Sequence, residues 1–245
     1  MRLDVYLTEK GFYKSRTRAL RAIREGLVSV AGNTVRKPAF EVTPELEAKV
    51  SAGDDPVKFV SRGGLKLEFA LERFGLSAEG RRCIDIGASS GGFTQVLLEN
   101  GAKSVDAVDV GHGQLAPELT ADPRVRNIEN CDVRQFVPEH KYDFLTMDVS
   151  FISINLLAGT LHSFLLPGAN AVVLFKPQFE VGRANIGKGG VVRSQKLALE
   201  YLENTVDLYE NCGFKLRGMA RSPVAGGDGN TEYLLWFTVL PENIS

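Results

Sequence analysis

The sequence is poor in cysteine and has no long apolar run. Its three cysteines, Cys83, Cys131 and Cys212, are odd in number and widely spaced, so they indicate neither a disulfide framework nor a zinc motif. No apolar run approaches the roughly 18 residues that a membrane span needs, and the N-terminus lacks a signal-peptide pattern. We therefore expect a cytoplasmic protein with reduced cysteines, no metal and no membrane partner.

An excess of charge of either sign is also missing, because 29 Lys and Arg offset 30 Asp and Glu and leave a net charge of −1. The total gives no reason to expect nucleic-acid binding, but the distribution does. A helix predicted over 15–24 carries Ala19, Ala22 and Ile23 at helical spacing, and its basic side chains project mostly from other faces. Residues 10–24 contain no acid and six basic residues, namely Lys10, Lys14, Arg16, Arg18, Arg21 and Arg24. Such a face can contact phosphates, although a merely solvated basic face is an open alternative.

The length of 245 residues allows one or two domains. After the basic helix we predict two short strands joined by a turn at 31–33. Residues 51–56 are polar, charged and turn-rich, and we interpret them as a linker. The sequence therefore predicts an N-terminal domain at 1–56 and a second domain at 57–245.

From residue 60 onward, apolar runs alternate with helical segments. A helix is predicted over 65–74, and strands are predicted at 83–86, 104–109, 126–131, 143–148 and 170–175. Two last runs, 214–220 and 232–239, are separated by a loop too short for a helical crossover, so they should be antiparallel. We predict an α/β fold with a Rossmann-like, seven-stranded, mostly parallel sheet and a C-terminal antiparallel hairpin, preceded by a small α+β domain.

A glycine-rich turn follows the first strand of this sheet and opens a helix. The turn runs Asp85-Ile-Gly-Ala-Ser-Ser-Gly-Gly-Phe93. Glycine permits positive φ and a close approach of backbone to ligand, so a strand, such a turn and a helix suit a nucleotide-like cofactor. The predicted contacts are Asp85, Gly87, Ser89, Gly91 and Phe93, although helix packing is an equally ordinary role for Phe93.

Three further acids, Asp109, Asp132 and Asp148, end later apolar runs, and ligands of open α/β sheets bind at these carboxyl ends. Asp109 lies about where a ribose-binding acid is expected, and Asp132 could accept from an adenine amine. Any one of these acids could instead be a turn former or a helix cap. A dinucleotide-binding protein is the rival interpretation, but it favours glycine where Ser89 stands and does not usually have the terminal hairpin. Both features resemble S-adenosylmethionine-dependent methyltransferases.

Two lysines and a glutamate stand out beside Asp148. Lys176 ends an apolar strand, Lys66 lies near the apolar face of the helix before the first strand, and Glu232 opens the last strand. Each residue also has an ordinary structural interpretation. Lys176 could extend its amine to solvent, Lys66 could be a solvated helix lysine, and Glu232 could be a glutamate of the common kind at the start of a strand. Taken together, Lys66, Asp148, Lys176 and Glu232 resemble the Lys-Asp-Lys-Glu tetrad of FtsJ-like ribose 2′-O-methyltransferases.

The resemblance extends along nearly the whole chain. Four segments, 60–66 (VSRGGLK), 148–153 (DVSFIS), 176–180 (KPQFE) and 187–192 (GKGGVV), are similar to the TlyA family, which is also known as haemolysin A. That family joins an FtsJ-like domain to an N-terminal alpha-L RNA-binding module. The N-terminal segments 2–7 (RLDVYL), 15–16 (SR) and 26–30 (GLVSV) match this module.

The resemblance implies transfer of methyl from S-adenosylmethionine to the 2′-hydroxyl of a cytidine in ribosomal RNA. A ribose hydroxyl is a poor nucleophile, so general base catalysis is expected, with Lys176 nearest the proton and Lys66 as its cationic neighbour. The implied RNA contacts are Arg2, Lys14, Arg16 and Lys37. The implied partner is ribosomal RNA or a ribosomal subunit, and we expect a monomer.

Family members that modify both ribosomal subunits tend to have longer termini, so this chain more closely resembles those acting only on 23S rRNA, and 16S rRNA is left open as an additional target. Two alternatives remain open. A haemolytic, pore-forming protein would need an insertion segment that the sequence does not show. A base-modifying RNA methyltransferase would more often show an Asn/Asp-Pro-Pro-aromatic run where Asp148-Val-Ser-Phe151 stands.

Overall fold

The computed structural model describes residues 1–13, 15–53, 59–226 and 229–241. The chain divides into two compact units, Met1–Lys58 and Phe59–Ser245, and each is described by itself. Lys14 and half of the predicted linker, from Asp54 to Pro56, lie outside the described residues.

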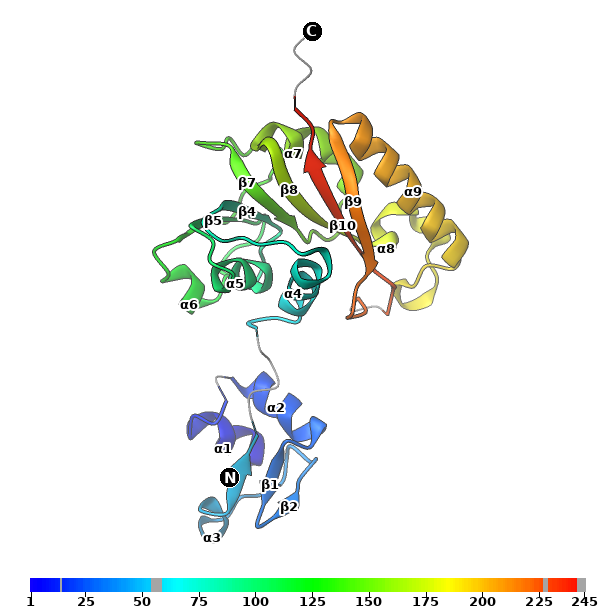
Figure 1. Ribbon diagram of the computed structural model, residues 1–245. Helices are drawn as coiled ribbons and strands as arrows, with labels where there is room; N and C mark the ends of the chain where they lie inside the picture. The colour runs from blue at the N-terminus through cyan, green and yellow to red at the C-terminus, as the bar shows by residue number, and fades with distance from the viewer. Residues whose placement is uncertain (14, 54–58, 227–228, 242–245) are drawn as a thin grey trace. The chain divides into compact units, whose positions relative to one another are not determined.

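The first unit packs two helices, α1 (Leu3–Glu9) and α2 (Arg16–Glu25), with a three-stranded sheet of order β2-β1-β3 (Figure 1). The strands are β1 (Val28–Val30), β2 (Asn33–Thr34) and β3 (Val50–Ala52), and the short helix α3 (Pro44–Glu47) precedes β3. The amide of Arg18 donates to the Ser15 hydroxyl at the start of α2, and Gly26 ends the helix with φ of 81°. Leu3, Leu7, Ala19, Ile23 and Val28 form part of its core.

The predicted linker was placed too early, because Ser51 and Ala52 belong to a strand. Val50–Ala52 pairs antiparallel with Val28–Val30 along its full length. The polar sequence concealed it, because an edge strand needs backbone partners more than apolar side chains.

The second unit contains a seven-stranded sheet of order β6-β5-β4-β7-β8-β10-β9. Its parallel strands are β4 (Arg82–Ile86), β5 (Ser104–Val108), β6 (Val125–Ile128), β7 (Tyr142–Met147) and β8 (Leu165–Phe175). The last two, β9 (Phe214–Arg221) and β10 (Tyr233–Val239), are antiparallel to each other, and β10 lies between β8 and β9. The predicted sheet with its terminal antiparallel pair is confirmed.

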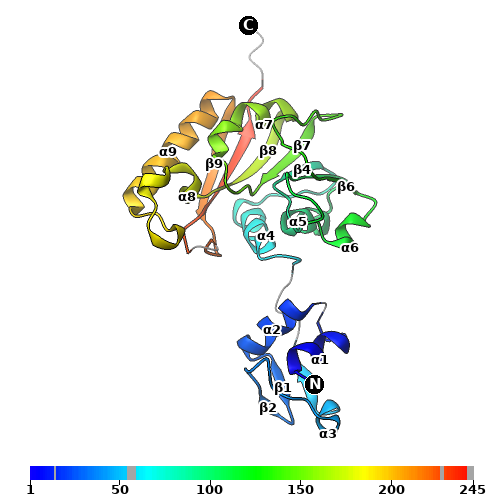
Figure 2. The same ribbon diagram turned by 180° about the vertical axis from the view of Figure 1, so that it is seen from behind.

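Helices cover both faces of this sheet (Figures 1 and 2). One face is packed by α4 (Gly63–Phe74) and α5 (Gly92–Glu99), through Leu67 and Val96 among others. The opposite face is packed by α7 (Ala158–Phe164) and α9 (Gln195–Asn211), through Leu161 and Tyr209. The remaining short helices are α6 (Pro117–Thr120), α8 (Pro177–Glu180), and the 3₁₀ turns Ile154–Leu156, Arg183–Asn185 and Lys188–Gly190.

The sheet order reverses at β4, since the chain runs outward through β5 and β6 and then returns to β7 on the other side. Loops that leave β4 and β7 at their carboxyl ends therefore separate and open a crevice. Asp85 is the fourth residue of β4, Asp109 directly follows β5 and Asp148 directly follows β7. The fold thus brings the predicted acids to one edge of the sheet.

Candidate active site

The glycine loop between β4 and α5 is built so that only glycine fits at position 87. A Cβ atom at Gly87, where φ is 78°, would lie 2.6 Å from the carbonyl oxygen of Asp148. Gly87 and Ala88 also donate their amides to the carbonyl of Val108. The loop is therefore fastened between the ends of β5 and β7, close to both.

Asp85 has a different position from the predicted one. Its carboxylate is fully buried and accepts hydrogen bonds from the hydroxyls of Thr94 (2.7 Å) and Thr146 (2.8 Å). It lines neither of the two cavities described below. Burial raises the pKa of Asp85 to about 6. The prediction of direct cofactor contact by Asp85 is therefore corrected: this carboxylate ties α5 to β7 beneath the loop, because its side chain points into the core.

The larger cavity at this edge has a volume of about 730 Å³ and is lined by parts of the loops that follow β4, β5, β6 and β7. Asp109 and Asp132 both contribute to its wall. The Asp109 carboxylate accepts the amides of Ser89 (2.8 Å) and Gly111 (2.7 Å), one on each oxygen. Each oxygen retains a further lone pair, so Asp109 can still accept from two ligand hydroxyls.

Asp132 is held by its neighbour Arg134, whose side chain and amide donate to the carboxylate. These bonds lower the pKa of Asp132 to about 2, so it stays ionised at neutral pH. The rest of the wall is largely apolar and includes Val110, Phe151 and Ile152. Acids beside an apolar slot suit a nucleoside, whose ribose is polar and whose base is flat. The pattern of strand-end acids could be predicted from the sequence, but these apolar residues were missed.

The loop after β7 carries the most exposed part of that wall. Phe151 is 92% exposed and has φ of 66°, and its ring lies 5.3 Å from that of Phe179. The half-buried carboxylate of Glu180 holds the loop by accepting hydrogen bonds from the Ser153 hydroxyl and the Ile154 amide. Burial raises the pKa of Glu180. The segment 176–180 therefore fixes the loop that follows Asp148.

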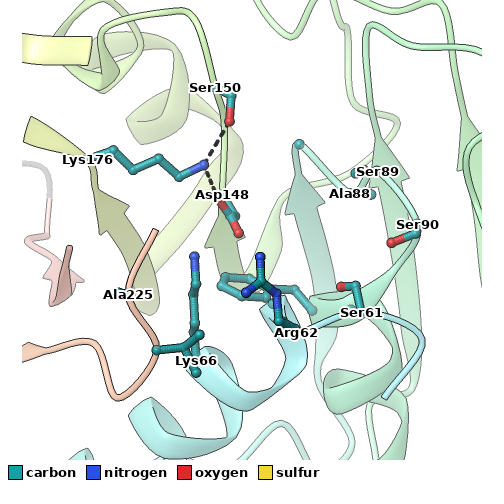
Figure 3. A pocket seen from close by; sticks show the side chains of 15 residues that line it. Ser61, Arg62, Lys66, Ala88, Ser89, Ser90, Asp148, Ser150, Lys176 and Ala225 are labelled. Carbon is teal, nitrogen blue, oxygen red and sulfur yellow. Dashed lines mark hydrogen bonds and ion pairs between the residues drawn. The ribbon is translucent and has the colours of Figure 1, made fainter. Parts of the chain in front are cut away.

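The smaller cavity has a volume of about 290 Å³ and gathers three members of the predicted tetrad, Lys66, Asp148 and Lys176 (Figure 3). Both lysines are only 8% exposed. Lys66 reaches it from α4 and Lys176 from the end of β8, so the two side chains enter from different elements. Gly87, Ser89, Asp148 and Ser150 line both cavities, which therefore share a wall.

The tetrad forms two ion pairs. The Lys176 amine lies 2.6 Å from Asp148 Oδ1 and donates to the Ser150 hydroxyl at 2.9 Å. The Lys66 amine lies 2.5 Å from Glu232 Oε2. Glu232 is 2% exposed and does not line the cavity, so it contacts Lys66 from beneath. Two buried ammonium groups are thus each matched by a carboxylate.

Ser150 and Arg62 are among the polar residues of this cavity that were not predicted. Ser150 fixes the Lys176 amine, and Arg62 points into the cavity beside Lys66 in Figure 3. Both lie in segments that the sequence analysis singled out, 148–153 and 60–66. Phe93 also lines the small cavity but is 3% exposed, so it packs mainly in the core. Gly91 has φ of 95°, and a Cβ atom there would clash with Leu119 and Leu115; it lines neither cavity.

The predicted RNA contacts of the first unit are not all free cations. Arg2 and Arg16 both bind the buried carboxylate of Asp4, through Nε at 2.9 Å and 2.7 Å. The hydrogen bond from Arg2 is the main cause that lowers the pKa of Asp4. Both guanidinium groups remain about half exposed, and Lys37 is exposed. The cluster of Arg2, Arg16 and Asp4 therefore orders two arginines at the surface with a net charge of +1.

The described part of the chain contains no helix that is both long enough and apolar enough to span a membrane. Within the same residues, no three His, Cys, Asp or Glu side chains are grouped so that they could hold a metal ion.

Comparison with known proteins agrees with this geometry. Residues 59–239 match the FtsJ-like methyltransferase family, and residues 1–47 match the S4 domain. The 16S/23S rRNA (cytidine-2′-O)-methyltransferase TlyA of Mycobacterium tuberculosis is 40% identical over 96% of this chain and 88% of its own. The 23S rRNA (cytidine-2′-O)-methyltransferase TlyA of Campylobacter jejuni is 34% identical over 97% of this chain and 99% of its own.

Solved structures also match this chain, at high and at low sequence identity. The structure of a candidate hemolysin from Streptococcus thermophilus is 40% identical, has a TM-score of 0.75, and aligns with 98% of this chain and 88% of its own. The N-methyltransferase NodS of Bradyrhizobium japonicum, solved with S-adenosyl-L-homocysteine, aligns with 73% of this chain and 85% of its own. Its TM-score of 0.51 at 13% identity shows a shared fold alone.

Proposed function

Because this chain belongs to the FtsJ-like methyltransferase family, we propose that it transfers a methyl group from S-adenosylmethionine to the 2′-hydroxyl of a cytidine in ribosomal RNA. The observation that carries the proposal is the pair of buried lysines, each with a carboxylate partner, in a cavity that shares a wall with a nucleoside-sized one. The names of the relatives support rRNA and cytidine as the substrate, and 23S rRNA occurs in both names.

The larger cavity is the proposed site of the cofactor. Asp109 would accept the two ribose hydroxyls, Asp132 would face the adenine edge, and the loop residues Gly87 and Ser89 would lie at the wall toward the smaller cavity. S-adenosylmethionine supplies an electrophilic methyl on a sulfonium that is already a good leaving group. The protein's main task is then to align the attacking hydroxyl and to accept its proton.

Lys176 is the proposed proton acceptor, because its amine lies in the small cavity next to the shared wall. A lysine accepts a proton only as the neutral amine. Lys66 and Arg62 place two further cations in the same cavity. Asp148 and Ser150 orient the Lys176 amine, and Glu232 orients that of Lys66. Lys66, Asp148, Lys176 and Glu232 are thus the proposed catalytic set.

The first unit is proposed to bind the RNA that carries the target. It matches the S4 domain and presents ordered arginines on α2 and at residue 2. Contacts of arginine and lysine with phosphates give affinity and orientation without reading sequence.

The proposal is tested by incubating the purified chain with S-adenosylmethionine and with 23S rRNA, 16S rRNA and each ribosomal subunit, then mapping 2′-O-methyl groups. The expected product is one 2′-O-methylated cytidine in large-subunit rRNA, absent with a Lys176→Ala variant. Methyl groups on bases, or no transfer to any rRNA, would refute it.

A further inference from the structure

The segment between α8 and α9 contains the motif 187–192, for which the proposed catalysis has no use. Residues 181–199 comprise that segment and the first residues of α9. They contain no acid and carry four cations, namely Arg183, Lys188, Arg193 and Lys196. We propose that this segment, called here the basic loop, binds phosphates of the substrate RNA beside the target nucleotide. The inference rests on the proposed function and adds a second RNA-binding surface, in the methyltransferase unit itself.

The four cations are available for an external partner. All four are exposed, and within the described residues none of them forms an ion pair. Other cations of this unit do have such partners, including Arg124 with Asp122 and Lys215 with Glu210. Lys196 lies in the first turn of α9, where the helix dipole disfavours a cation. The stability of α9 therefore does not explain why a cation stands at position 196.

The basic loop is an ordered structure and is anchored to the rest of the unit. Within it, Ile186 and Val192 form an antiparallel β-bridge. The buried side chain of Asn230 accepts the Val192 amide and donates to the Gly190 carbonyl, both at 2.9 Å. Loops that only face solvent do not need a buried amide to hold them, so this anchoring supports a specific position for the charges.

The anchor places the basic loop next to the catalytic set. Asn230 precedes Glu232 by two residues, and α8 begins at Pro177, directly after Lys176. A third cavity, distinct from the two described above and of about 100 Å³, is lined by Pro177, Val192 and Asn230 among others. In Figure 1 the chain between α8 and α9 lies beside the ends of β9 and β10.

The conformation of the loop also leaves its backbone open. Gly189 has φ of 77°, and no atom lies within 4 Å of the position that a Cβ atom would take there. Gly189 and Gly190 thus leave the backbone without side chains directly after Lys188. A backbone free of side chains, flanked by cations, suits a close approach of phosphate oxygens.

The test compares two triple variants of the full chain with equal changes in charge. One replaces Lys188, Arg193 and Lys196 with glutamine. The control replaces Arg81, Lys103 and Lys141 with glutamine. These three residues are exposed and directly precede β4, β5 and β7, so they lie at the amino ends of the strands, opposite the catalytic set. Binding of 23S rRNA is measured over a series of salt concentrations, together with the KM for RNA, kcat and S-adenosylmethionine affinity.

We expect the basic-loop variant to show a salt dependence shallower by about 2 to 3 units of slope, because roughly one unit is lost with each phosphate contact. Its KM for RNA should rise at least tenfold, with kcat and S-adenosylmethionine affinity retained, while the control should match the wild type. Equal salt slopes in the two variants would overturn the inference. Failure of the wild type to methylate any rRNA would instead refute the proposed function.

Discussion

Lys66 and Glu232 are 166 positions apart in the sequence, yet the amine of one lies 2.5 Å from a carboxylate oxygen of the other. Both are buried, and both are charged groups that burial alone would disfavour. The pair joins α4 to the start of β10 below the small cavity. A helix and the last strand of the sheet are thus connected at the proposed site of methyl transfer.

The first prediction concerns this pair. Glu232→Gln leaves the Lys66 ammonium without its counter-charge, so the free energy of unfolding should fall by roughly 3–5 kcal/mol. Denaturant titration measures the change. The double variant Lys66→Met, Glu232→Gln should recover part of that loss while remaining inactive. A double variant as unstable as the single one would contradict the pairing.

The second prediction concerns the cofactor. Asp109→Ala should weaken S-adenosylmethionine binding by roughly 1–3 kcal/mol, because ligand hydroxyls and two loop amides lose their acceptor. Titration calorimetry measures the affinity, and Asp122→Ala, an acid outside both cavities, serves as the control. An unchanged affinity of the Asp109 variant would exclude Asp109 from ribose binding.

The third prediction concerns proton transfer. Lys176→Ala should retain binding of S-adenosylmethionine and RNA but lose methyl transfer by about 100-fold or more. Lys176→Arg should not restore it, since a guanidinium stays protonated. Single-turnover rates with saturating RNA are the measurement. Near-normal turnover by the arginine variant would mean that positive charge and position suffice, and Lys176 would not be the base.

The fourth prediction concerns the first unit. Replacing Arg16 and Lys37 with alanine should weaken rRNA binding and lower its salt slope by about one unit per lost phosphate contact. S-adenosylmethionine affinity should not change, because both residues belong to the other unit. Since Arg16 also binds Asp4, thermal unfolding is measured in parallel. An unaltered salt slope would show that this basic face is only solvated.

The fifth prediction concerns pH. Because the folded pKa of Asp85 is about 6 and an unfolded Asp titrates near 3.9, its contribution to stability is full below about pH 4. That contribution is lost as pH rises through 6, by about 3 kcal/mol in all. Asp85→Asn does not ionise, so its stability relative to the wild type should rise between pH 4 and pH 7.

Equilibrium unfolding at several pH values tests this expectation. Asp122→Asn is the control, because Arg124 lowers the pKa of Asp122 below its ordinary value. Its stabilisation is then nearly complete above about pH 5, so the difference between Asp122→Asn and the wild type should change little up to pH 7. A constant difference between Asp85→Asn and the wild type over this range would show that Asp85 is not held in a desolvated site.

Most of the second unit could be predicted from local patterns. Apolar runs and turn residues identified all seven strands of its sheet, and the short connection before residue 232 identified the antiparallel pair. The predicted ends of the strands were less accurate. The third strand was expected to reach residue 131, but β6 ends at Ile128, because Asn130 takes a left-handed φ of 54°. In the first unit, α1 and β3 were missed because short elements carry little periodicity.

The sequence by itself determined which residue types would meet at the carboxyl edge of the sheet: the glycine loop, the strand-end acids and the two lysines. Only the tertiary structure decided how they pair. Placing β10 between β8 and β9 brings Glu232 under Lys66 and leaves Asp148 to Lys176. The tertiary structure also buries the side chain of Asp85 in the core and anchors the basic loop through Asn230. The physical reason is that hydrophobic period and turn chemistry act over a few residues, whereas these contacts depend on strand order and join residues as many as 166 positions apart.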